Sequence, residues 1–251
     1  AVGIGAQDGG TNAVNANATE NMGTLTVSTE SGDARGIVAQ DSGSKNTVAG
    51  LGAITVSGTT TTNGVDAEDG GTNIVNHEGE TGRGDITVTS TTTSADGVYA
   101  MDGGANTVYG YDNIKVNAGA KSTTEPVEAS GIYADAINGA KSSNTVVLSG
   151  GIEVYGKADT DHVYYGGLSN YEVSGIHAGA GSENTVTMGA AISATGGRMM
   201  TAGSVAGIEA SGGSTNTVDG VTDITANDKG SNGVAYGIAN TDSQNNVNTK
   251  A

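Results

Sequence analysis

The sequence contains no cysteine, tryptophan or phenylalanine, only one proline, and aromatic residues at 4% of the chain, all of them tyrosine. The absence of cysteine excludes disulfide bonds and thiolate chemistry. Because large side chains are few, any core has to consist mainly of Val, Ile and Ala, which favours an elongated fold with a narrow interior. No segment approaches the roughly 18 apolar residues of a membrane helix, so we expect the chain not to be embedded in a membrane.

Basic residues are also scarce. Ten Lys and Arg stand against 27 Asp and Glu, which gives a formal net charge of −17. An excess of negative charge repels the phosphates of nucleic acids and the head groups of anionic lipids. We therefore expect no nucleic-acid partner and no binding to an anionic membrane surface.

Glycine is abundant, with 43 residues, and one phrase recurs along the chain. It reads GIVAQDSGSKNTVAGLGAITV at 36–56, GVYAMDGGANTVYGYDNIKV at 97–116 and GIEASGGSTNTVDGVTDIT at 207–225. Each copy has an anchor glycine followed by an apolar–x–Ala piece, then Asn-x-Val, then a third apolar–x–apolar piece. The anchor glycines, spaced 28 to 44 residues apart, are Gly3, Gly36, Gly64, Gly97, Gly131, Gly175, Gly207 and Gly237.

The apolar residues of each copy alternate with polar ones, and this period of two predicts β-strands. Helical repeats of similar length need windows with a period of 3.6, which are absent. Three short strands per copy, stacked copy on copy, predict an all-β fold: a parallel β-helix (β-solenoid) of about 7–8 coils. We expect one domain over 1–251, a segment of a longer solenoid, with its longest loop insertion at 155–174. The inward residues of the coil 36–63 would be Ile37, Ala39, Val48, Ile54 and Val56.

The asparagine of the Asn-x-Val piece keeps one fixed place in the repeat. An amide side chain both donates and accepts hydrogen bonds, so stacked asparagines can bond along the axis as a ladder. The alternative is a separate turn-forming role in each coil. Regular recurrence favours the ladder, whose members are Asn12, Asn46, Asn73, Asn106, Asn144, Asn184 and Asn216.

The tandem order GI-x-A, NTV, ITV, in an acidic chain with few aromatics, resembles the passenger domains of bacterial autotransporters. The resemblance runs from Gly3 to Val247 and lies in eight ordered repetitions, since NTV alone is unspecific. It implies a right-handed β-helix exported through the outer membrane to the bacterial cell surface, an extracellular location. For the adhesin branch it implies binding to host glycans, matrix proteins or sister cells, with roles in virulence and biofilm formation. The catalytic signature of the serine protease passengers is absent.

Tyrosines gather in the middle of the chain, where eight of the nine lie between 99 and 171. Tyr99 and Tyr133 take the same outward position in consecutive coils, followed by His177, and we expect these rings to stack on the surface. Exposed tyrosine suits contact with sugar rings and protein partners, although tyrosines of the long insertion would equally serve to pin it to the rod. The candidate ligand-binding residues are Tyr99, Tyr133, Tyr155, Tyr164, Tyr165, Tyr171 and His177.

An aspartate follows the anchor glycine by four or five positions in six coils. Stacked carboxylates repel one another, and Ca²⁺ would relieve this repulsion. However, aspartate before glycine is also an ordinary turn residue, and the nonapeptide of calcium-binding β-helices is absent. We therefore expect a turn role, no metal and no cofactor. The residues concerned are Asp8, Asp41, Asp69, Asp102, Asp135 and Asp242.

Catalysis is disfavoured. Lyases built on β-helices need clustered basic residues, whereas Arg35, Arg83 and Arg198 are scattered, and the aspartate row recurs where a catalytic pair should be singular. Rows of outward threonine resemble ice-binding surfaces, but Lys115 and Glu153 interrupt them. We expect no catalytic residue: the chain is predicted to be a non-enzymatic adhesin segment that binds a host glycan, a matrix protein or itself. The alternatives are a stalk of an extracellular fibre that stacks end to end and, less favoured, a polysaccharide-processing enzyme.

Overall fold

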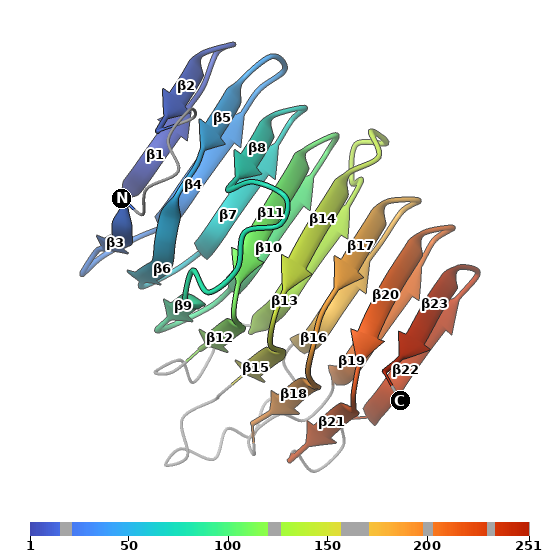
Figure 1. Cartoon of the computed structure of the whole chain (residues 1–251). Coiled ribbons are helices and arrows are strands. Elements are labelled where there is room, and N and C mark those ends of the chain that lie inside the picture. Colours follow the sequence, from blue (N-terminus) through green and yellow to red (C-terminus); the bar gives the residue numbers. More distant parts are fainter. Residues whose placement is uncertain (16–21, 120–126, 157–170, 198–202, 230–233, 251) are drawn as a thin grey trace.

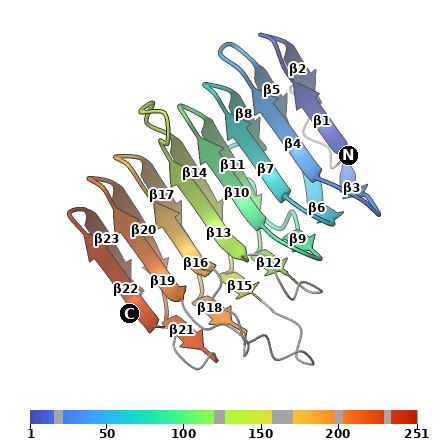
Figure 2. The ribbon, with the colours of Figure 1, turned by 180° about the vertical axis from the view of Figure 1, so that it is seen from behind.

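The chain winds into a rod of stacked coils, with the N- and C-termini at opposite ends (Figures 1 and 2). The computed structural model describes residues 1–15, 22–119, 127–156, 171–197, 203–229 and 234–250. These residues form 23 strands, β1–β23, and no helix. The strands assemble into three parallel sheets, so the fold is a parallel β-solenoid with three strands per coil, as the repeat predicts. It is of the right-handed type, as the resemblance implies. Among the described residues, no helix is long and apolar enough to cross a membrane.

The three sheets are the three walls of the rod. The first wall consists of β1 (Val2–Ala6), β4 (Ala34–Gln40), β7 (Thr62–Glu68), β10 (Ala95–Met101), β13 (Glu128–Asp135), β16 (Tyr171–Ala178), β19 (Gly203–Ser211) and β22 (Val234–Thr241). The second wall consists of β2 (Thr11–Val14), β5 (Lys45–Val48), β8 (Thr72–Val75), β11 (Ala105–Tyr111), β14 (Ser143–Leu148), β17 (Glu183–Thr187), β20 (Thr215–Val221) and β23 (Gln244–Thr249). The third wall consists of β3 (Gly23–Ser28), β6 (Leu51–Gly58), β9 (Ile86–Ser90), β12 (Ile114–Ala118), β15 (Ile152–Gly156), β18 (Ile192–Gly196) and β21 (Ile224–Asp228).

Equivalent positions of the repeat face one another in neighbouring coils. On the first wall Val98 pairs with Val65 on one side and with Ile132 on the other. This register places each inward Val, Ile or Ala over its counterpart, so the core is a continuous column inside the three walls. The predicted inward set of the coil 36–63 is buried, with every member at most 1% exposed: Ile37, Ala39, Val48, Ile54 and Val56.

Inside the stack of coils, only glycine fits at the anchor position, because no space is left for a Cβ atom. A Cβ atom on Gly131 would lie 2.3 Å from Cγ2 of Ile152 and 2.6 Å from the carbonyl oxygen of Gly175 in the next coil. Gly97, one coil earlier, would meet Ile114 and Gly131 at similar distances. The backbone of the first wall therefore packs directly on the isoleucine of the third wall, and only hydrogen fits between them.

Candidate functional site

The outer face of the first wall carries two parallel columns of polar and aromatic side chains in the middle coils. The anchor glycine and the residue after it both face the core. The outward residues on either side of this pair therefore stand three positions apart on each strand. The residues of the aromatic column, defined as Tyr99, Tyr133 and His177, stand two positions after the anchor glycine of their strand. The polar column, defined as Asp96, Ser130 and Ser174, directly precedes it.

The rings of the aromatic column are stacked along the rod axis. The ring centroids of Tyr99 and Tyr133 are 5.2 Å apart, those of Tyr133 and His177 are 4.9 Å apart, and both pairs are inclined by 10°. The Tyr133 hydroxyl donates to Asp135 Oδ2 at 3.0 Å, which fixes the middle ring. The rings therefore stack as their shared position in the repeat predicts, and because the ring faces cover one another, the column presents mainly ring edges to a ligand.

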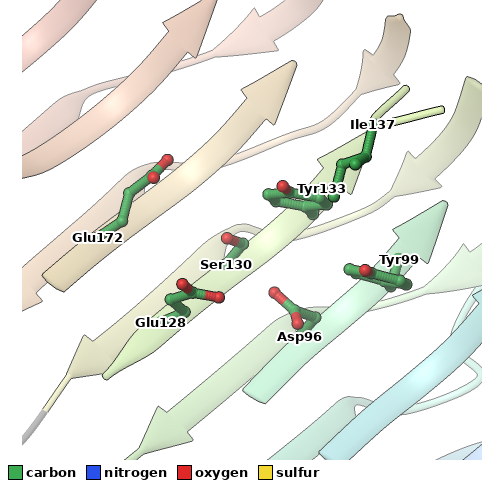
Figure 3. Close-up of a pocket in the computed structure, with 7 residues that line it drawn as sticks. All are labelled: Asp96, Tyr99, Glu128, Ser130, Tyr133, Ile137 and Glu172. Carbon is green, nitrogen blue, oxygen red and sulfur yellow. The ribbon is translucent and has the colours of Figure 1, made fainter. Parts of the chain in front are cut away.

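A cavity of about 210 Å³ opens between the two columns. Figure 3 shows Tyr99 and Tyr133 side by side on neighbouring strands, with Asp96, Ser130 and Glu128 in the adjoining row. The cavity, called here the acidic pocket, is lined by Asp96, Tyr99, Glu128, Ser130, Tyr133, Ile137 and Glu172. Its rim includes the exposed Ile137, which offers apolar contact beside three carboxyl groups.

The carboxyl groups of the acidic pocket differ in their affinity for protons. Burial, together with the charges of Glu128 and Asp66, raises the pKa of Asp96 well above its usual range. Burial and the charge of Glu172 raise the pKa of Glu128. The pKa of Glu172 is lowered, because the nearby His177 outweighs the effect of its burial. The three carboxyl groups of the pocket thus hold their protons with different strengths, Asp96 and Glu128 more tightly than usual and Glu172 less tightly.

A third group of charges lies in the preceding coil, beneath Tyr99. Asp66 is fully buried and accepts a hydrogen bond from Asn63 Nδ2 at 2.9 Å. Arg35 Nη1 lies 3.2 Å from Asp66 Oδ2 and 3.0 Å from Glu68 Oε2. Burial and the charge of Glu68 nevertheless outweigh Arg35 and raise the pKa of Asp66 to about 7. Asp66 Oδ1 has no hydrogen-bond partner among the described residues.

Asp66→Asn is expected to stabilise the protein increasingly as pH rises. A carboxyl whose folded pKa is raised favours folding while it keeps its proton, and this contribution is lost as pH rises through about 7. Asparagine stays neutral throughout, so the variant lacks this dependence on pH, while Arg35 and Glu68 keep their charges. At about 1.4 kcal/mol per pKa unit, the difference in unfolding free energy between variant and wild type should shift by roughly 2–3 kcal/mol from pH 5 to pH 8.

Urea unfolding at several pH values measures this difference. Asp242→Asn is the matched control, because Asp242 is an exposed turn residue. A difference for Asp66→Asn that stays constant between pH 5 and pH 8 would show that Asp66 does not retain its proton in the folded state.

The asparagines of the second wall form a continuous chain of side-chain hydrogen bonds. The amide Nδ2 of Asn106 donates to Oδ1 of Asn144 at 2.9 Å, and its own Oδ1 accepts from Asn73 at 2.9 Å. The same Nδ2 donates to the backbone oxygen of Tyr99 at 2.6 Å. This pattern, called here the asparagine ladder, runs through Asn12, Asn46, Asn73, Asn106, Asn144, Asn184, Asn216 and Asn245. It therefore fixes the backbone of the aromatic column, since Asn144 and Asn184 bond to Tyr133 and His177.

The aspartate row occupies the turns between the first and second walls. Asp8, Asp41, Asp69, Asp102 and Asp242 have φ angles between 50° and 74°, a left-handed conformation that aspartate and asparagine tolerate better than most residues. Asp135 does not share this conformation and instead accepts the hydroxyl of Tyr133.

The remaining candidates lie apart from the acidic pocket or outside the described residues. Tyr155 is half-buried on β15 of the third wall, where Lys229 Nζ lies 5.7 Å from its ring centroid. Tyr164 and Tyr165 lie outside the described residues, as does most of the insertion 155–174. Tyr171 begins β16, and its side chain is not among those described.

Sequence reasoning missed the polar residues of the acidic pocket, which are Asp96, Glu128, Ser130 and Glu172. It also missed Glu209 of β19, which pairs with His177. A signal for two of them was present, because Asp96 and Ser130 each directly precede an anchor glycine and so share one outward position. Glu209 likewise aligns with His177. Glu128 and Glu172 are outward residues near the start of their strands, a place the repeat phrase does not include.

Comparison with protein-family models, curated proteins and solved structures gave no match to this chain. The fold and the site are therefore the only basis for saying to which class of protein this chain belongs. The chain is a parallel β-solenoid whose first wall carries an acidic pocket edged by stacked aromatic rings.

Proposed function

We propose that this chain is a segment of a non-enzymatic bacterial surface adhesin, exported like the autotransporter passenger domains that it resembles, and that it binds glycan at the acidic pocket. The observation that carries the proposal is the cavity of about 210 Å³ between the aromatic and polar columns. Such a site combines ring edges, the apolar Ile137 and convergent hydroxyl and carboxyl groups, as sites for hydroxylated ligands do.

The size and charge of the acidic pocket narrow the range of ligands that it could bind. Its volume lies below the roughly 300–1,000 Å³ of pockets for drug-sized ligands, so it suits one sugar ring at a time. Asp96, Glu128 and Glu172 supply mainly hydrogen-bond acceptors, which match the hydroxyl and amino groups of a sugar. Uronic acids, sialic acids and sulfated sugars would bring negative charge toward a chain of net charge −17. The proposed ligand is therefore a neutral or amino-bearing glycan.

Glycan-array binding of the full chain tests this proposal. Neutral and amino sugars should bind, and acidic sugars of similar size should bind at least about tenfold more weakly. Tyr99→Ala should weaken binding by about tenfold, as expected when an aromatic contact of about 1–1.5 kcal/mol is lost. Tyr236→Ala is the control, because Tyr236 is an exposed tyrosine on the same wall at the last coil.

Other outcomes would point to the competing functions. Equal binding by wild type and Tyr99→Ala, or a preference for acidic sugars, would contradict a glycan site at the acidic pocket. Aggregation of cells displaying the chain, with no glycan bound, would favour homotypic adhesion. Shortened or unsaturated sugar products on incubation with polysaccharides would favour an enzyme, in which the unequal pKa values of Asp96 and Glu172 would separate acid from base.

A further inference from the structure

Three ligand-type atoms converge beside the acidic pocket, at the end of the aromatic column. His177 Nδ1 lies 2.7 Å from Glu172 Oε1 and 4.0 Å from Glu209 Oε2. All three atoms lie within 4.8 Å of one another. Glu172 and His177 come from β16, and Glu209 comes from β19, where it pairs directly with His177.

These atoms are shielded from solvent, and no hydrogen bond of normal geometry satisfies them. Glu172 Oε1, His177 Nδ1 and Glu209 Oε2 are each buried without such a bond among the described residues, and the 2.7 Å contact of His177 Nδ1 with Glu172 Oε1 is an ion pair when the imidazole is protonated. The His177 residue as a whole is only 7% exposed. Buried polar atoms of native proteins are normally satisfied, and an exception calls for a bound ion, a water or a functional role. Two carboxylates facing one imidazole nitrogen supply the donors that a divalent cation needs.

The histidine is held in place before any cation arrives. Its ring stacks on Tyr133 at 4.9 Å, and its backbone oxygen accepts a hydrogen bond from Asn184 of the asparagine ladder at 2.6 Å. Tyr133 is itself anchored through its hydroxyl to Asp135. Ligands that are positioned by such outer contacts bind metals more tightly than freely rotating ones.

We propose that Glu172, His177 and Glu209 form a binding site for a divalent transition-metal ion of the Zn²⁺ class. Zinc binds imidazole nitrogen and carboxylate oxygen at about 2.0–2.2 Å, which places tetrahedral ligands roughly 3.3–3.6 Å apart. The observed separations of 2.7 and 4.0 Å from His177 Nδ1 bracket that range, so side-chain shifts of less than about 1 Å suffice. The imidazole donor favours Zn²⁺ over Ca²⁺ and Mg²⁺, which prefer all-oxygen sites.

The site goes beyond the proposed glycan function and does not depend on it. Three protein ligands leave at least one position of a tetrahedral ion open. Glu172 also lines the acidic pocket, whereas Glu209 does not. Glu209 therefore separates the two functions experimentally.

Titration calorimetry of the metal-stripped full chain with ZnCl₂ tests the site, with CaCl₂ and MgCl₂ as comparison cations. We expect one strong Zn²⁺ site per chain and at least about tenfold weaker binding of Ca²⁺ and Mg²⁺. Glu209→Gln should weaken Zn²⁺ binding at least tenfold and leave glycan binding unchanged. Glu183→Gln is the matched control, because Glu183 is an exposed glutamate of the neighbouring β17.

Histidine NMR signals provide a second measurement that does not depend on the folding of a variant. The chain has three histidines, His77, His162 and His177, and one equivalent of Zn²⁺ should shift the ring signals of His177 alone. The proposal is overturned if Zn²⁺ leaves those signals unchanged, if Glu209→Gln binds Zn²⁺ as tightly as wild type, or if Ca²⁺ binds equally well. Zn²⁺ binding that persists in Tyr99→Ala, while glycan binding is lost, would support the metal site and the glycan site separately.

Discussion

Replacing Gly131 with alanine is expected to lower the free energy of unfolding by about 3 kcal/mol or more, the upper end of the cost of overpacking a well-packed interior. The added Cβ would lie 2.3 Å from Ile152 Cγ2 and 2.6 Å from the backbone oxygen of Gly175. The isoleucine is itself fully packed, at 1% exposure, and the oxygen belongs to a strand of the next coil. Relief would require the coils to separate locally, which breaks the hydrogen bonds between β13 and β16.

The same substitution at Gly237 is the control. Gly237 is the equivalent anchor glycine on β22, and a Cβ there would meet nothing within 4 Å. Gly237→Ala should therefore change the unfolding free energy by less than about 1 kcal/mol, and restricting the unfolded chain should make the change stabilising. Urea unfolding followed by circular dichroism measures both variants in the 251-residue chain. Equal stability of Gly131→Ala and Gly237→Ala would mean that the first wall does not pack on the third wall as described.

The fold was predictable because its main constraint repeats in every coil. A period of two identifies the strands, and equal order of the three pieces in each copy requires like positions to stack. The register between Tyr99 and Tyr133 and the burial of Ile37 follow from that stacking without further information. The anchor glycine was visible as a pattern, but its reason, close contact with Ile152 or its equivalents, appears only in three dimensions.

The acidic pocket was less predictable because it depends on side chains that do not repeat. Alternation assigns Asp66 to the outer face, where solvent exposure is the simple expectation, yet Asp66 is 0% exposed. Asp96, which is 6% exposed, faces outward only because Gly97 and Val98 both face the core and so break the alternation. The burial of Asp66 arises from neighbours in adjoining coils, such as Arg35 and Tyr99, which differ from coil to coil. The contact between Glu172 and His177 joins two side chains of the same strand. It depends on the side-chain conformations, which the spacing of residues in the sequence does not predict.

Asn106→Ala is expected to destabilise the protein by about 3–5 kcal/mol and to weaken glycan binding. Alanine removes three hydrogen bonds, to the side chains of Asn73 and Asn144 and to the backbone of Tyr99. Asn106 is 2% exposed, so the abandoned partners are shielded from water, and each costs about 1–3 kcal/mol when it is left unpaired. The loss of the bond to Tyr99 also frees the backbone that positions the first ring of the aromatic column.

A matched variant separates the ladder from the general cost of removing an amide. Asn117 lies on β12 in the same coil, exposed on the third wall, and Asn117→Ala should change the unfolding free energy by less than about 0.5 kcal/mol. Urea unfolding gives both values, and hydrogen exchange of the amides in β10 and β14 locates the loss. If each asparagine served only as a local turn residue, protection in β14 would remain at its wild-type level. If the ladder couples the coils, protection from exchange falls in β10 and β14 together. The reason is that the side-chain amide of Asn106 donates both to Tyr99 on the first wall and to Asn144 on the second.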